Sequence, residues 1–111
     1  MAGIPDPPDD LVPRGRGRKF WRQVFKEFDP NPREVELVAE AARLMDHLDA
    51  VRVQLRDVPL VVDGRTHPLV VERRLALSEL RLLLGSIGWG DEVDPLRRGR
   101  ARKAAATRWG L

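Results

Sequence analysis

The chain has 111 residues and a mass of 12.6 kDa, which is the size of one compact domain. It contains no cysteine and two histidines, which excludes disulfides, thiolate zinc sites and histidine clusters. It has no run of about 18 apolar residues, and its acidic, proline-rich first 13 residues do not resemble a signal peptide. We therefore expect a cytoplasmic protein with no membrane partner and with no metal or other cofactor.

Charge is arranged in blocks, although the net charge is only +3. Residues 14–26 carry six basic side chains and no acidic ones, residues 27–63 carry four basic and nine acidic ones, and residues 95–111 carry six basic and no acidic ones. Arginine supplies 17 of the 20 basic residues. This excess suits phosphate contacts, but it also fits the coding bias of a GC-rich genome, so it does not identify a partner.

Residues 1–17 contain four prolines, and this composition predicts a flexible, extended arm. Residues 18–28 predict a short amphipathic helix. At 100° per residue, one face collects Phe20, Trp21, Val24, Phe25 and Phe28, and the opposite face collects Arg18, Lys19, Arg22 and Lys26.

A second helix is predicted from Pro32 to about Arg56, because Asn31 is a good cap and Pro32 and Glu34 suit a first helical turn. At about 25 residues it would be roughly 37 Å long. Its apolar seam has alternating spacings of four and three, at Leu37, Ala41, Leu44, Leu48, Val51 and Leu55.

Residues 58–67 contain a β-branched run followed by Asp63-Gly64, which predicts a short hairpin or an ordered loop. Pro68 then begins a third helix, capped by Thr66 or His67, that runs to about Leu84, where glycines interrupt it.

The third helix is apolar on two faces, and a helix of that kind needs two neighbours. One stripe comprises Leu69, Ala76, Leu80 and Leu83, and the other comprises Val71, Leu75 and Leu82. Between the stripes lie an acidic row, Glu72 and Glu79, and a basic row, Arg74 and Arg81. We expect the second stripe and both charged rows to form an oligomer interface; the alternative is that the hairpin or Trp89 covers this stripe.

The sequence favours no enzymatic site. The two serines, Ser78 and Ser86, lack the context of a nucleophile, and no glycine-rich phosphate loop is present. Glu34, Glu36 and Glu40 suit a helix start better than a metal site. His47 is interpreted as a surface residue and His67 as a helix cap. We therefore expect no catalytic residue and no metal ligand.

Nucleic acid is the favoured partner. Six phosphate contacts would weaken binding about 10³-fold between 50 and 200 mM salt. The turn between the first two helices does not make a DNA-reading helix-turn-helix, because glutamates begin the second helix and would repel phosphate. The candidate DNA-binding residues are Arg14, Arg16, Arg18, Lys19, Arg22, Lys26, Arg97, Arg98, Arg100, Arg102, Lys103 and Arg108.

Together these elements predict a small all-α bundle of about three helices with a short β-ribbon or loop. Residues 1–17 form the arm, residues 18–90 form a core for oligomerisation and DNA binding, and residues 91–111 form a basic tail. We expect the tail to be disordered alone and helical on a partner.

The order of these elements resembles the small terminase subunits of tailed phages. The resemblance covers nearly the whole chain: a proline-rich arm, the basic Lys19-Phe20-Trp21-Arg22 helix, a long acidic helix, a valine-rich ribbon ending in His67-Pro68, a Leu/Arg-rich helix, and a basic tail ending in Arg108-Trp109. It implies a homo-oligomeric ring in the host cytoplasm. Such a ring would bind double-stranded phage DNA at the packaging start and recruit or regulate the large terminase subunit, an ATPase and nuclease.

Two other classes of protein fit the same pattern. A small transcriptional regulator or antitoxin would bind DNA as a dimer and read a palindromic site. A phage connector protein would bind only other proteins and would show no salt-dependent DNA binding.

Overall fold

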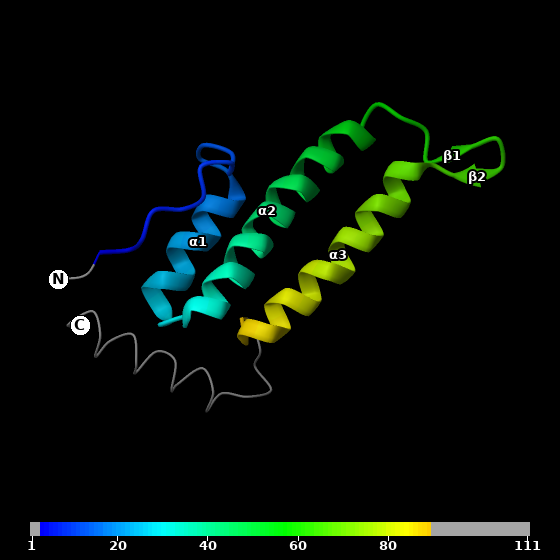
Figure 1. Ribbon diagram of the computed structural model, residues 1–111. Helices are drawn as coiled ribbons and strands as arrows, with labels where there is room; N and C mark the ends of the chain where they lie inside the picture. The colour runs from blue at the N-terminus through cyan, green and yellow to red at the C-terminus, as the bar shows by residue number, and fades with distance from the viewer. Residues whose placement is uncertain (1–2, 90–111) are drawn as a thin grey trace.

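The computed structural model describes residues 3–89, and the structural statements below concern these residues. They form helix α1 (Arg16–Glu27), helix α2 (Pro32–Leu55), strands β1 (Val61–Val62) and β2 (Arg65–Thr66), and helix α3 (Pro68–Ile87). Figure 1 shows α2 between α1 and α3, with the antiparallel hairpin at the end of the molecule away from α1. The predicted all-α fold with a short β-ribbon is confirmed.

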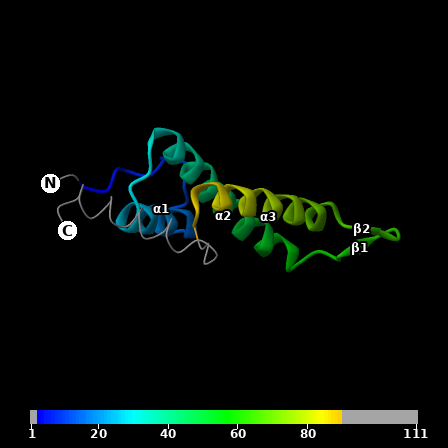
Figure 2. The ribbon, with the colours of Figure 1, turned by 90° about the horizontal axis from the view of Figure 1, so that it is seen from below.

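The molecule has two parts of different thickness. Helix α2 packs against both of the other helices, and α1 lies along its first half. The second half of α2 and the first half of α3 continue beyond α1 as a helix pair that ends in the hairpin, as Figures 1 and 2 show from two directions. We call residues 47–72, which comprise the end of α2, the hairpin and the start of α3, the stalk, and the remaining described residues the head.

Local sequence signals account for the helix ends. The Asn31 side chain accepts a hydrogen bond from the Glu34 amide at 2.8 Å, and the Glu34 carboxylate accepts one from the Asn31 amide at 3.1 Å. His67 Nδ1 accepts a hydrogen bond from the Leu69 amide at 3.0 Å, so the predicted cap of α3 is confirmed. The predicted end near Leu84 is three residues too early, because α3 continues through Gly85 to Ile87; a glycine does end it, at Gly88, whose φ is 72°.

The hairpin turn also follows its sequence. Asp63 and Gly64 have φ values of 52° and 74°, the left-handed conformation that a two-residue turn between antiparallel strands requires. The strands pair Val61 with Thr66 and Val62 with Arg65.

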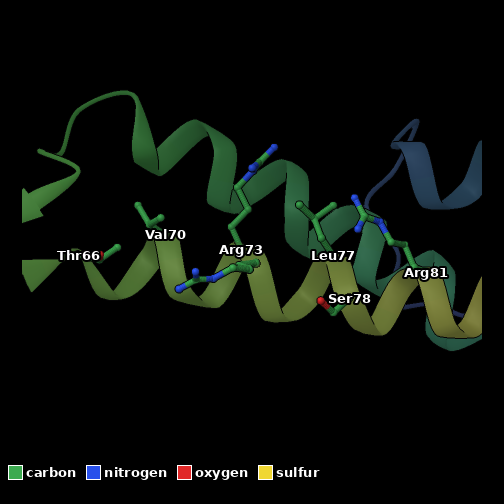
Figure 3. A pocket seen from close by; sticks show the side chains of 7 residues that line it. Thr66, Val70, Arg73, Leu77, Ser78 and Arg81 are labelled. Carbon is green, nitrogen blue, oxygen red and sulfur yellow. The ribbon is translucent and has the colours of Figure 1, made fainter.

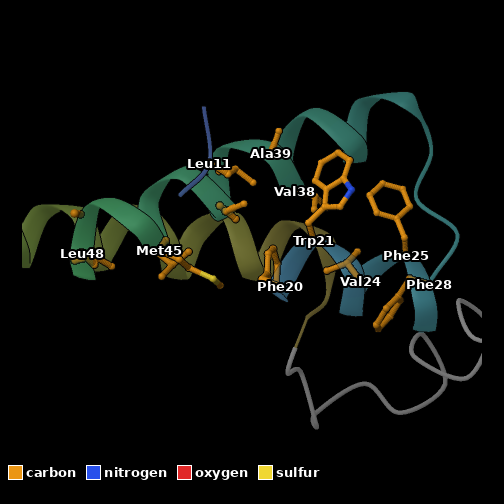
Figure 4. Packing of buried hydrophobic residues seen from close by; sticks show 14 residues of the cluster. Leu11, Phe20, Trp21, Val24, Phe25, Phe28, Val38, Ala39, Met45 and Leu48 are labelled. Carbon is orange, nitrogen blue, oxygen red and sulfur yellow. The ribbon is translucent and has the colours of Figure 1, made fainter. Parts of the chain in front are cut away.

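The hydrophobic core lies mainly in the head, and Leu48 extends it into the stalk (Figure 4). The aromatic face of α1 is buried against small and aliphatic side chains of α2, and α3 contributes Ala76 and Leu80. The Trp89 ring, just beyond α3, lies 5.3 Å from that of Phe20 and 5.4 Å from that of Phe28, measured between ring centroids. These contacts attach the end of α3 to α1, and such aromatic pairs stabilise beyond their burial alone.

The arm is packed on the helices, although its composition predicted a flexible segment. Leu11 is 2% exposed and belongs to the core. Trp21 Nε1 donates a hydrogen bond to the Pro5 carbonyl at 2.7 Å. The Asp46 carboxylate accepts hydrogen bonds from the Val12 amide at 2.8 Å and the Gly17 amide at 3.0 Å. Asp46 thus joins the arm, the start of α1 and the middle of α2.

Helix α1 approaches α2 closely at Gly17. A Cβ at this position would lie 2.5 Å from the Ala42 carbonyl oxygen. This distance leaves no room for a side chain, so the sequence requires glycine here.

Replacing Asp46 tests how firmly the arm and α1 are held. The Asp46→Ala substitution leaves two amides without their acceptor, and we expect it to lower the free energy of unfolding by about 1–3 kcal/mol. Asp49→Ala is the matched control, because it removes only an exposed ion pair with Arg16 and should cost less than about 0.5 kcal/mol. Urea denaturation measures both, and hydrogen exchange should be faster at Val12 and Gly17 in Asp46→Ala alone. Equal losses in the two variants would contradict this role of Asp46.

Alanine substitutions test the close approach at Gly17. Gly17→Ala should destabilise the fold by about 1–3 kcal/mol, because the methyl group must displace the α2 backbone. Gln54→Ala is the control within a helix: the Gln54 side chain is exposed on α2, so its removal should change the free energy of unfolding by less than about 0.5 kcal/mol. Thermal unfolding followed by circular dichroism compares the two, and an unchanged midpoint for Gly17→Ala would contradict the steric argument.

Candidate nucleic-acid interface

Helix α1 separates apolar and cationic residues onto opposite faces. Phe20, Trp21, Val24 and Phe25 are buried, which leaves Lys19, Arg22 and Lys26 exposed on the other side. The spacings of three and four residues place these three side chains in one row along the helix. We call Lys19, Arg22 and Lys26 the cationic row.

The arm borders the cationic row and forms a shallow groove with it. Ile4 lies beside the row and is 42% exposed. The groove encloses about 810 Å³. It combines three cations with aliphatic surface and has a single carboxylate at its edge; the lining residues are Ile4, Lys19, Arg22, Gln23, Lys26 and Glu27. A negatively charged chain with apolar segments, such as a sugar-phosphate backbone, fits this combination.

The other predicted DNA-binding residues of this region are not all in the row. Arg18 is half-buried and donates hydrogen bonds from Nε and Nη2 to the Leu11 carbonyl at 3.3 and 3.2 Å, so it holds the arm. Arg16 forms an exposed ion pair with Asp49 at 3.5 Å. Arg14 is exposed in the turn before α1, with φ of 59°. The six predicted tail residues, from Arg97 to Arg108, lie outside the described residues.

Two of the acidic side chains near the start of α2, those of Glu34 and Glu40, make other contacts, whereas Glu36 is exposed. Glu34 completes the helix cap, and Arg43 donates hydrogen bonds to Glu40 at 2.6 Å and to Asp10 at 2.7 Å. The hydrogen bond from Arg43 lowers the pKa of the Asp10 carboxyl below its usual value. Within residues 3–89, no ion pair neutralises Lys19, Arg22 or Lys26.

A second basic hollow of about 420 Å³ lies along α3. Figure 3 shows its lining residues along one side of the helix. Three of them are arginines: Arg74 and Arg81 belong to the predicted oligomer interface, and Arg73 belongs to no predicted site. The full set of lining residues is Thr66, Val70, Arg73, Arg74, Leu77, Ser78 and Arg81.

The residues of the predicted oligomer interface lie mostly at the surface of α3. Leu75 and Leu82 are 61% and 73% exposed, and Val71 is half-buried. Arg74, Arg81, Glu72 and Glu79 are also exposed. Trp89 packs on α1, and the hairpin lies at the far end of the stalk (Figure 1), so neither covers Leu75 and Leu82.

Several side chains that could carry chemistry are used in structural hydrogen bonds. His47 Nε2 lies 2.9 Å from Glu72 Oε1, and this contact links α2 to α3. His67 caps α3, and the Ser86 hydroxyl donates to the Leu82 carbonyl at 2.9 Å. Among the described residues, no three histidine or acidic side chains are placed to hold a metal ion.

Comparisons of the chain with protein-family models, with curated proteins and with solved structures found no match. In the part of the chain that the structure describes, no helix is both long and apolar enough to span a bilayer.

Proposed function

We propose that the chain binds the phosphate backbone of double-stranded DNA through the cationic row and acts as a non-enzymatic adaptor in phage DNA packaging. One observation carries the binding proposal: three exposed cations lie in one row on α1, with no ion-pair partner among the described residues. Unpaired cations at fixed spacing can each replace a counterion of DNA.

The dimensions of the row suit a phosphate backbone. Seven residues separate Lys19 from Lys26, which corresponds to about 10 Å along the helix. One DNA strand presents a phosphate about every 3.4 Å of helix rise, so a row of this length can contact neighbouring phosphates of one strand. Contacts of this kind fix position and orientation but do not read sequence.

The packaging role is supported by the resemblance to small terminase subunits. In that role, the head would hold DNA and the chain would act on the large terminase subunit, which supplies the ATPase and nuclease. The arm is attached to the same helix that carries the cationic row, so docking of the arm sets the surface that is offered to DNA.

A dimeric DNA-binding regulator or antitoxin is the second candidate function. The observation that favours it is the uncovered stripe of α3 with a basic row on one side and an acidic row on the other. This pattern suits pairing of two copies, and such a regulator would bind a palindromic site with two cationic rows.

DNA affinity tests the cationic row. We expect the triple variant Lys19→Gln, Arg22→Gln, Lys26→Gln to lose the salt dependence that three phosphate contacts confer, which is a slope of about 2.7 in log affinity against log salt. These contacts alone account for about a 40-fold loss of wild-type affinity between 50 and 200 mM salt. Fluorescence anisotropy with a labelled duplex measures both quantities.

The matched control removes the same charge elsewhere. Arg33, Arg52 and Arg56 are exposed on or just after α2, and their triple glutamine variant should keep most of the affinity and the slope. If both variants lose affinity equally, binding depends on net charge and the assignment to α1 is wrong.

The packaging role has a separate test. If the chain is a packaging adaptor, adding it with DNA to the large terminase subunit of the same genome should change the rate of ATP hydrolysis, and the α1 triple variant should reduce this effect. A phosphate-release assay measures the rate. If the rate of ATP hydrolysis does not change when the wild-type chain is added, the packaging role is wrong and the dimeric regulator is favoured.

A further inference from the structure

Helix α3 exposes the repeat pattern of a coiled-coil seam. Leu75 and Leu82 are seven residues apart and largely exposed. Val71, Ser78 and Gly85 extend the pattern, so that positions 71, 75, 78, 82 and 85 follow one another in alternating steps of four and three residues. Positions repeated in this way face one partner helix when two helices wrap around each other. We call Val71, Leu75, Ser78, Leu82 and Gly85 the α3 seam.

The charged residues beside the seam select the orientation of such a partner. Arg74 and Arg81 directly precede the two leucines, whereas Glu72 and Glu79 directly follow Val71 and Ser78. In a parallel pair of identical helices, a residue of the basic row on one helix meets the residue of the acidic row that is five positions later in the sequence of the other helix. Arg74 of each copy would then face Glu79 of the other copy. An antiparallel pair would bring arginine to arginine and glutamate to glutamate.

We propose that α3 pairs in parallel with α3 of a second copy of this chain, through the α3 seam and reciprocal contacts between Arg74 and Glu79. The pairing does not depend on the proposed DNA binding, and its test needs no DNA.

Contacts within one chain do not explain these residues. Within residues 3–89, Arg74, Glu79 and Arg81 form no ion pair, whereas Glu72 is held by His47. Arg74, Ser78 and Arg81 are among the residues that line the hollow along α3, and the hollow leaves room for a carboxylate of a second copy.

Gly85 is an independent observation that points to a close neighbour. It lies inside α3, where glycine costs up to about 1 kcal/mol relative to alanine. A Cβ at this position would meet nothing within 4 Å, so packing inside the chain does not require glycine. On the seam, a missing side chain allows a second backbone to approach. The same argument applies to the small Ser78 side chain.

Parallel pairing has a geometric consequence for the heads. Trp89 attaches the end of α3 to α1, so α1 lies at the same end of α3 in each copy. A parallel pair therefore places both cationic rows at one end of the dimer, where a single duplex could contact both.

Cysteine cross-linking tests the orientation in a chain that has no cysteine of its own. In a parallel pair in register, each seam residue meets its own copy, so Val71→Cys and Ser78→Cys should each form a disulfide-linked dimer under mild oxidation. In an antiparallel pair only a residue at the crossing point meets itself, so at most one of the two would link. Glu36→Cys, exposed on α2, is the control and should form no disulfide-linked dimer. Linking at one seam position or at neither overturns the proposal.

Charge reversal tests the contacts. Arg74→Glu and Glu79→Arg should each weaken dimerisation by about 4- to 30-fold, because two attractive pairs become repulsive. Mixing the two variants should restore the dimer, because every pair is again of opposite charge. Light scattering over a range of concentrations measures association, and circular dichroism checks that each variant is folded. A monomeric wild-type chain, or an assembly whose mass neither reversal changes, overturns the pairing.

Discussion

The contact of Asp46 with the start of α1 fixes the arrangement on which the rest of the head depends. Gly15, the residue before α1, provides no side-chain cap, and Asp46 supplies the missing acceptor from the middle of α2. Its negative charge lies at the positive end of the α1 dipole, where an anion is favoured. The second oxygen binds the arm at Val12, so one carboxylate sets the positions of two segments. The absence of a side chain at Gly17 allows this geometry.

Once α1 is fixed in this way, its two faces acquire different roles. The aromatic face is committed to the core, and the cationic row is held toward solvent on a rigid support. The stalk, in contrast, consists of two helices without a third to cover them, and its continuation along α3 leaves a stripe uncovered. The surface proposed for phosphate and the surface proposed for self-association therefore lie on different helices.

Local signals explain what the sequence could predict. The cap at Asn31, the turn at Asp63-Gly64 and the amphipathic pattern of α1 each depend on residues a few positions apart, and the structure confirms them. The cationic row followed from the same helical spacing. The two faces of α3 were also visible as periodicity, although the helix continues past Gly85 and ends at Gly88.

The features that the sequence could not predict depend on contacts between residues far apart in the chain. Asp46 is 34 residues from Val12 and 29 from Gly17, so no periodic pattern connects them. Leu11 lies among prolines and aspartates, and its burial depends on a site formed by distant residues. Arg18 looked like a member of the cationic row, but the nearby Leu11 carbonyl takes its guanidinium. The pair of glycines at 15 and 17 was the available signal for a close approach of two backbones.

The way in which the arm is held has a consequence for how its sequence can vary. Three of its contacts use main-chain atoms: the Pro5 carbonyl, the Leu11 carbonyl and the Val12 amide. Any residue type supplies a carbonyl, so many of the prolines and aspartates of the arm could be replaced by other residues without loss of these hydrogen bonds. Deleting one residue between positions 5 and 11 would instead shift the chain by about 3.5 Å, beyond the reach of a hydrogen bond. Among related sequences, the arm should therefore be constant in length and variable in composition.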